Sequence, residues 1–238
     1  MSGAGFTIIA VSIVLAACVQ ASIGFGMGML AAPVIALIDP TLLPGTIVML
    51  AALITLMVVV RERKHLDLRG TWWALAGRLP GTAAGAALVA WLPPRALAVL
   101  VAVVVLGGVA MAATGWAPSP RPFTLVSAGT ISGLMGTATS IGGPPMALVW
   151  QGLSGPRLRG TMSAFFLTGS VLSILALTVS GAIDGTTLGR TLLLLPAVAA
   201  GYGLSRLANR WLDPGRLRTA AIVVSVLGAL VLLVAQLG

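Results

Sequence analysis

The chain has 238 residues, of which 58% are hydrophobic and only 8% are charged. A soluble domain carries roughly 25% charged residues, so the composition excludes an ordinary soluble protein and predicts an all-α, polytopic membrane protein. The net charge of +9 does not indicate nucleic-acid binding, because the basic residues are scattered through short loops between apolar runs, as in cytoplasmic loops. The N-terminus lacks the Lys and Arg of a signal peptide, so we expect no cleavage.

Eight apolar segments follow one another along the chain, and the longer ones reach the roughly 20 residues that a spanning helix needs. The first and the fifth contain an internal break, GFGMG at Gly24–Gly28 and TATSIGGPP at Thr137–Pro145. We expect each to form a hairpin that is followed by three spanning helices. The first predicted repeat, residues 1–117, contains the hairpin 6–38 and the helices 44–60, 71–92 and 95–116; the second, residues 118–238, contains the hairpin 121–152 and the helices 158–180, 187–207 and 216–237.

An ordered series of matches between the two halves indicates an internal repeat. A proline follows a glycine nine residues later in both broken segments, at Gly24 and Pro33 and at Gly136 and Pro145. Further matches follow in order, from Gly45 with Gly160, through Pro80 with Pro196 and Gly85 with Gly201, to Gly108 with Gly228. Two halves of the same architecture are a common plan in membrane transporters.

The basic residues predict how the halves are oriented, because Lys and Arg favour cytoplasmic loops. If each broken segment enters and leaves on one face, twelve of the fourteen basic residues lie on one side, and only Arg95 and Arg190 lie on the other. If each broken segment crosses once, the basic loops fall on opposite faces. The hairpin model therefore predicts inverted repeats, with both the N-terminus and the C-terminus outside.

The breaks themselves indicate a ligand site. Backbone groups cannot stay unpaired against lipid, so a broken helix at membrane depth is tolerated only where protein or water covers it. Free N–H groups at the start of a half-helix favour anions, and glycine permits close approach of a ligand. Two hairpins that enter from opposite faces would bring their tips together near the midplane, where a transported anion is expected.

The sequence resembles the sulfite exporter TauE/SafE family of bacterial membrane transporters. The resemblance lies in SIGFGMGMLAAPVIALIDP in the first half and GTISGLMGTATSIGGPPMALVWQGLSGPRLRGTMSAF in the second. It implies a location in the bacterial cytoplasmic membrane and transport of sulfite, organosulfonates or other small organic acids. One departure concerns the first tip, which often has consecutive glycines in the family, whereas here Phe25 and Met27 alternate with the glycines.

Candidate substrate contacts lie at and beside the two tips. Hydroxyl groups can donate to sulfite or sulfonate oxygens, although they also bond their own helix backbone in membrane helices. The glycines offer backbone contact, although close helix packing is their alternative role. The candidates are Ser22, Gly24, Gly26, Gly28, Thr137, Thr139, Ser140, Gly142 and Gly143, with Gln20 and Arg78 as further residues able to reach the cavity.

Titratable residues do not reveal a coupling mechanism. The five acidic residues fall in or beside the predicted loops, so no buried carboxylate is expected, and His65 belongs to the basic loop RERKHLD. Arg78 is the nearest candidate for a cation at the cavity, but we favour its snorkelling to the cytoplasmic surface. Export or import, the coupling ion and homo-oligomer formation are left open.

Other classes of function fit less well. An intramembrane enzyme needs a nucleophile with a base, a metal cluster or paired acids at membrane depth, and one His, one Cys and peripheral acids cannot provide these. No catalytic residue, metal site or cofactor is therefore expected, and the partners are a small anion and membrane lipid. An anion channel or facilitator is the alternative, because glycine tips can also line a pore.

Overall fold

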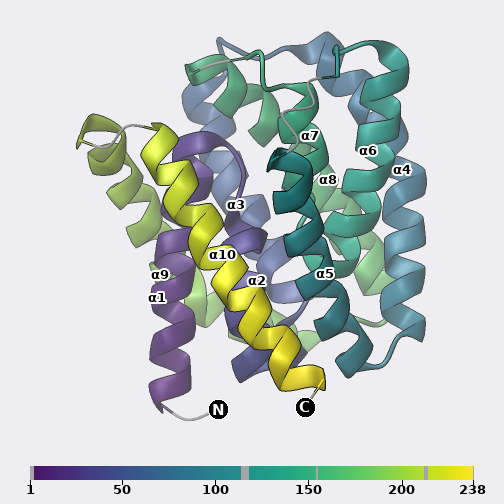
Figure 1. Cartoon of the computed structure of the whole chain (residues 1–238), viewed down its shortest axis with the longest axis vertical. Coiled ribbons are helices and arrows are strands. Elements are labelled where there is room, and N and C mark those ends of the chain that lie inside the picture. The colour runs from purple at the N-terminus through teal and green to yellow at the C-terminus, as the bar shows by residue number, and fades with distance from the viewer. Residues whose placement is uncertain (1–2, 114–117, 154, 212–213, 238) are drawn as a thin grey trace.

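The computed structural model describes residues 3–113, 118–153, 155–211 and 214–237, and nearly all of them lie in helices. The helices are long because a backbone in lipid must satisfy its own hydrogen bonds, so that Pro33, Pro80 and Pro196 all remain inside helices. Figure 1 shows the helices as a bundle in which the two chain ends lie at the same end. The first half of the chain forms α1 (Gly3–Ile23), α2 (Met27–Ile38), the short 3-10 helix η1 (Pro40–Leu42), α3 (Gly45–Glu62), α4 (Leu68–Trp91) and α5 (Pro94–Ala113). The second half forms α6 (Pro122–Thr139), α7 (Gly143–Val149), α8 (Gly155–Val179), α9 (Gly185–Trp211) and α10 (Pro214–Leu237).

The two predicted breaks separate α1 from α2 and α6 from α7. The first break needs positive φ angles, 92° at Gly24 and 115° at Gly26, which glycine adopts without a steric penalty. The second contains the only described non-glycine residue with positive φ, Ser140 at 64°. Both breaks fall within the segments that the sequence marks, and the arms that follow them are short, 12 residues in α2 and 7 in α7.

The helices pack mainly across the two halves of the chain: α1 lies on α9, α3 on α8, α4 on α6 and α5 on α10. Glycines bring α4 and α6 into backbone contact. A side chain at Gly77 or Gly81 would collide with the carbonyl groups of Val126 and Thr130, and one at Gly129 would collide with that of Ala74. Small residues at helix interfaces allow such close approach in membranes, so α4 and α6 pack closely against each other.

Within the described residues, five helices are long and apolar enough to cross a membrane, at Gly3–Ile23, Gly45–Glu62, Pro94–Met111, Gly155–Val179 and Gly185–Ala208. Their outer surfaces keep large apolar side chains exposed, among them Val179 at 90% and Leu193 at 66%. A soluble protein rarely exposes such side chains together, whereas lipid accommodates them. The chain is a multi-pass membrane protein.

The two ends of the bundle are joined by different polar contacts. At one end, Glu62 of α3 accepts hydrogen bonds from Arg159 of α8, at 3.1 Å from Nε and 2.9 Å from Nη2. At the other, Arg190 of α9 donates to Thr41 at 2.6 Å and lies 3.8 Å from the carboxylate of Asp39. Glu62 corrects the expectation that no carboxylate is buried, since it ends α3 with its residue only 7% exposed.

Candidate functional site

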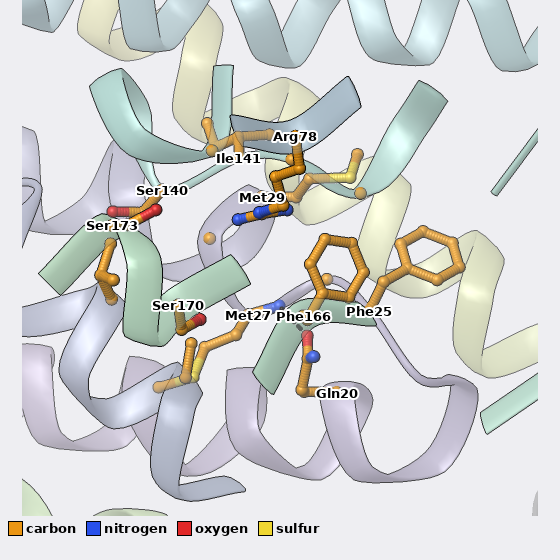
Figure 2. A pocket seen from close by; sticks show the side chains of 17 residues that line it. Gln20, Phe25, Met27, Met29, Arg78, Ser140, Ile141, Phe166, Ser170 and Ser173 are labelled. Atoms are coloured by element: carbon orange, nitrogen blue, oxygen red, sulfur yellow. Dashed lines mark hydrogen bonds between the residues drawn. The ribbon is translucent and has the colours of Figure 1, made fainter. Parts of the chain in front are cut away.

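A cavity of about 40 Å³ lies where the two breaks meet. A buried water occupies roughly 10–15 Å³ by the same measure, so the space suits a few waters or one compact oxyanion. Figure 2 shows side chains from both broken segments and from α4 and α8 around it. Its lining comprises Gln20, Phe25, Gly26, Met27, Gly28, Met29, Val48, Ala51, Arg78, Gly136, Ser140, Ile141, Gly142, Gly143, Phe166, Ser170 and Ser173.

The first break is held by the side chain of Gln20. Its amide nitrogen donates to the carbonyl of Gly24 at 3.2 Å, and its amide oxygen accepts the N–H of Met27 at 3.1 Å. The side chain thus replaces helical hydrogen bonds that the break interrupts. Gly28, in the first turn of α2, packs directly against the carbonyl group of Ser140, so the two breaks touch.

The second break is held by one contact to α3 and by one contact within its own hairpin. The hydroxyl of Ser140 donates to the carbonyl of Pro44, at the start of α3, over 3.0 Å. The hydroxyl of Ser132, two turns earlier in α6, donates to the carbonyl of Gly142 over 2.6 Å. The contact from Ser132 satisfies a carbonyl of the break, and the contact from Ser140 ties the tip to the start of α3 beside the cavity.

Arg78 of α4 brings a positive charge to the cavity, and it alone is charged among the described residues that line it. The residue is only 3% exposed, which corrects the expectation that it snorkels to the surface. Its Nη1 donates to the hydroxyl of Ser132 at 3.3 Å, and its guanidinium carbon lies 4.8 Å from the ring centre of Phe165 and 5.6 Å from that of Phe166. Aromatic faces attract a cation at these distances.

The guanidinium of Arg78 lacks a full set of partners. Its Nε is buried with no hydrogen-bond partner, and within the described part of the chain no carboxylate forms an ion pair with it. A buried charge normally requires pairing, because transfer from water costs several kcal/mol. The cavity therefore contains unused positive charge and unused donors.

The sequence-predicted candidates fall into two groups. Gly26, Gly28, Ser140, Gly142 and Gly143 line the cavity, as do Gln20 and Arg78. Four others lie outside the lining. Ser22 is buried, Gly24 packs on Arg159 and Met162, Thr137 shares a hydrogen bond with Ser173, and the hydroxyl of Thr139 donates to the carbonyl of Met135.

Comparison with known families decides which class of protein this site serves. The model of the family described as "Sulfite exporter TauE/SafE" matches residues 9–232. The chain belongs to the sulfite exporter TauE/SafE family. Members of this family are membrane transporters of the sulfite or sulfonate type rather than enzymes. No curated protein and no solved structure matches the chain.

Several residues at this TauE/SafE cavity escape sequence reasoning. Ser170 and Ser173 lie in α8, which has no break or motif to mark them, and Phe166 is indistinguishable from an ordinary core residue. For Ser132, one feature of the sequence could have identified the position. The residue lies 112 residues after Gln20, the offset that also relates Gly24 to Gly136, so the repeat alone would have placed both at equivalent positions before the breaks.

Proposed function

We propose that the protein is a secondary transporter that moves a small anion, sulfite or an organosulfonate, across the bacterial cytoplasmic membrane by alternating access. The observation that carries this proposal is Arg78, a buried residue that lines the cavity between the two breaks and whose Nε has no hydrogen-bond partner. Charged groups within membrane proteins usually mark substrate or ion pathways. An anion bound in this cavity would supply the negative charge that no carboxylate of the described residues supplies to Arg78.

The substrate is proposed to lie between the tips. Arg78 provides the charge, and the backbone of Gly26, Gly28, Gly142 and Gly143 lets the anion approach closely. Ser140, with Ser170 and Ser173 of α8, adds hydroxyl groups to the lining. Gly24, Thr137 and Thr139 then support the tips from behind through the contacts described above, and Ser22 is buried beside the first tip.

Packing between the halves supports an inverted repeat. Gly108 of α5 faces Pro144 of the second broken segment, and Gly228 of α10 faces Pro33 of the first. Gly108 and Gly228 are matched in the repeat, and each faces a proline of the other half's hairpin, although Pro144 is one residue before Pro145, the residue matched to Pro33. Two equivalent halves that can rock against one another are the usual basis of alternating access. The proposed orientation has both termini outside, which agrees with their position at one end of the bundle (Figure 1).

A channel or facilitator is the competing function. The contact between Gly28 and the Ser140 carbonyl and the small volume of the cavity favour a carrier, since a pore needs a continuous path. Single-channel currents in a planar bilayer would favour a channel over a carrier.

The test is anion flux in proteoliposomes that contain the purified protein. Vesicles are loaded with sulfite, methanesulfonate or acetate, with and without a pH gradient, and protein-free vesicles serve as the control. Saturable flux of a sulfur anion, with counterflow of labelled substrate, is expected for a carrier. Absence of flux of every anion from a demonstrably folded protein would overturn the proposal.

A further inference from the structure

A chain of two hydrogen bonds joins the buried cation to the second break. Nη1 of Arg78 donates to the hydroxyl oxygen of Ser132 at 3.3 Å, and the same hydroxyl donates its hydrogen to the carbonyl of Gly142 at 2.6 Å. A serine hydroxyl has one hydrogen and two lone pairs, so it can accept and donate in this way at the same time. Ser132 is 0% exposed, and no bulk water competes for either bond.

The two bonds differ in strength. The bond to Gly142 is short, and a donor that is polarised by a neighbouring cation is strengthened in a buried network. The bond from Arg78 is long for an N–H donor. A charged oxyanion accepts from a guanidinium more strongly than a neutral hydroxyl does, so it would compete successfully for the Nη1 hydrogens.

The first break has no such connection. Gln20, at the equivalent position of the repeat, holds Gly24 and Met27 by itself. None of its described hydrogen bonds involves a charged side chain. The two breaks are therefore held from equivalent positions of the repeat, the first by an amide side chain and the second by a hydroxyl. Only the second is linked to Arg78.

Gly142 has little freedom to leave its place. A Cβ on Gly142 would lie 2.8 Å from the backbone oxygen of Ser132 and 2.9 Å from its hydroxyl oxygen. The α-carbon of Gly142 thus packs closely on Ser132, which also donates a hydrogen bond to the Gly142 carbonyl. A change at Ser132 should therefore alter the conformation of the second break.

We infer that Ser132 is a positioning residue that couples anion binding at Arg78 to the conformation of the second break, through the Arg78–Ser132–Gly142 hydrogen-bond chain. The inference rests on the proposed function. When the anion takes the Nη1 hydrogens, the Ser132 hydroxyl loses its polarising cation and holds Gly142 less firmly. The second break is then the part of the site that responds to substrate, and the first is a fixed support.

The experiment compares Ser132→Ala, Ser132→Thr and Ser12→Ala with the unmodified protein. Ser12 is a buried serine in α1 that donates only to the carbonyl of Ile9 among its described contacts, so its replacement is the matched control. Two measurements are made on each: the KM and maximal rate of sulfite flux, and hydrogen–deuterium exchange of residues 24–28 and 139–143 with and without sulfite. Melting temperature is followed to exclude misfolding.

In the unmodified protein, sulfite should change the exchange of residues 139–143 and leave residues 24–28 unaffected. Ser132→Ala should raise exchange of 139–143 without sulfite, abolish the response to sulfite and lower KM by up to about tenfold, because the anion no longer has to displace the serine hydroxyl from Nη1 of Arg78. Ser132→Thr, which keeps the hydroxyl, should restore the response, and Ser12→Ala should behave like the unmodified protein. A Ser132→Ala protein with the original KM and sulfite response would overturn the inference, as would an unmodified protein that transports sulfite with no change at 139–143. Absence of flux in the unmodified protein would instead count against the proposed function.

Discussion

The guanidinium of Arg78 fills the space that a side chain on Gly169 would occupy. A Cβ built on Gly169 collides with the Nε and Cζ of Arg78, so α8 accommodates the buried cation only because this position has no side chain. The glycine therefore sets the place of the charge in the cavity, although it contributes no polar group itself.

Gly169→Ala is expected to displace Arg78 and reduce sulfite kcat/KM by at least about tenfold, because a shift of about 1 Å in a charged contact removes much of its energy. The measurement is flux in proteoliposomes. Gly189→Ala is the matched control, since Gly189 lies in α9 with open space around it, and it should leave flux unchanged. Equal flux in both variants would show that Arg78 does not need this space.

Replacing Arg78 tests the charge itself. Arg78→Gln should lower kcat/KM for anions by about a hundredfold or more, because a charged hydrogen bond and the local positive charge are both lost. Arg78→Lys keeps the charge but loses the planar fork, so a rise in KM of about tenfold is expected. Sulfite should also cease to raise the melting temperature in Arg78→Gln. Transport by Arg78→Gln at the original rate would remove the cation from the mechanism.

The breaks could be predicted from the sequence because glycine and proline act locally. The glycines of GFGMG adopt the positive φ angles of the first break, and the prolines of IGGPP lie in the first turn of α7, directly after the second. The position of Arg78 could not be predicted in this way. Whether an arginine in an apolar helix snorkels or is buried depends on the space its neighbours leave, and here that space comes from Gly169, far along the chain. The burial of Glu62 could not be predicted for the same reason, since it depends on Arg159 of α8, which donates hydrogen bonds to its carboxylate.

Gly28 tests whether the two breaks must touch. A Cβ on Gly28 would collide with the carbonyl of Ser140, which is backbone and cannot rotate away. Gly28→Ala should separate the tips, remove saturable flux and lower the melting temperature. Gly3→Ala, at a residue with nothing within 4 Å of the added Cβ, is the control. Normal flux in Gly28→Ala would mean that the contact is not needed for transport.

The stability of the protein should depend on pH through Asp184, which lies between α8 and α9, outside the membrane-spanning segments. Hydrogen bonds to its carboxylate from the backbone N–H of Thr187, and from the hydroxyls of Thr187 and Thr186, hold its pKa well below the usual range. Because the folded pKa is depressed, the stabilisation is present above the unfolded pKa of about 3.9 and is lost as pH falls through the folded value. Asp184→Asn should therefore lower the melting temperature at pH 7, and the difference from the unmodified protein should shrink below about pH 4. A difference that is constant with pH would exclude this carboxylate as its source.

Glu62 joins α3 to α8 beside the first break. It accepts from Arg159 and, at 3.1 Å, from the Nε of Arg61, whose Nη2 donates to the carbonyl of Ala21 in the last turn of α1 at 2.8 Å. Glu62→Gln leaves two partly buried arginines without their shared carboxylate, which should destabilise the fold by about 3 kcal/mol.

Denaturant titration of the purified protein in detergent measures this loss. Lys64→Gln, a charge change at an exposed residue of the same loop, should have an effect of less than about 0.5 kcal/mol. Adding Arg159→Gln to Glu62→Gln removes one of the unpaired charges, so the double variant should recover part of the stability. A double variant whose loss equals the sum of the two single losses would show that Glu62 and Arg159 do not act as a pair, and α3 and α8 would then be held together by their apolar contacts.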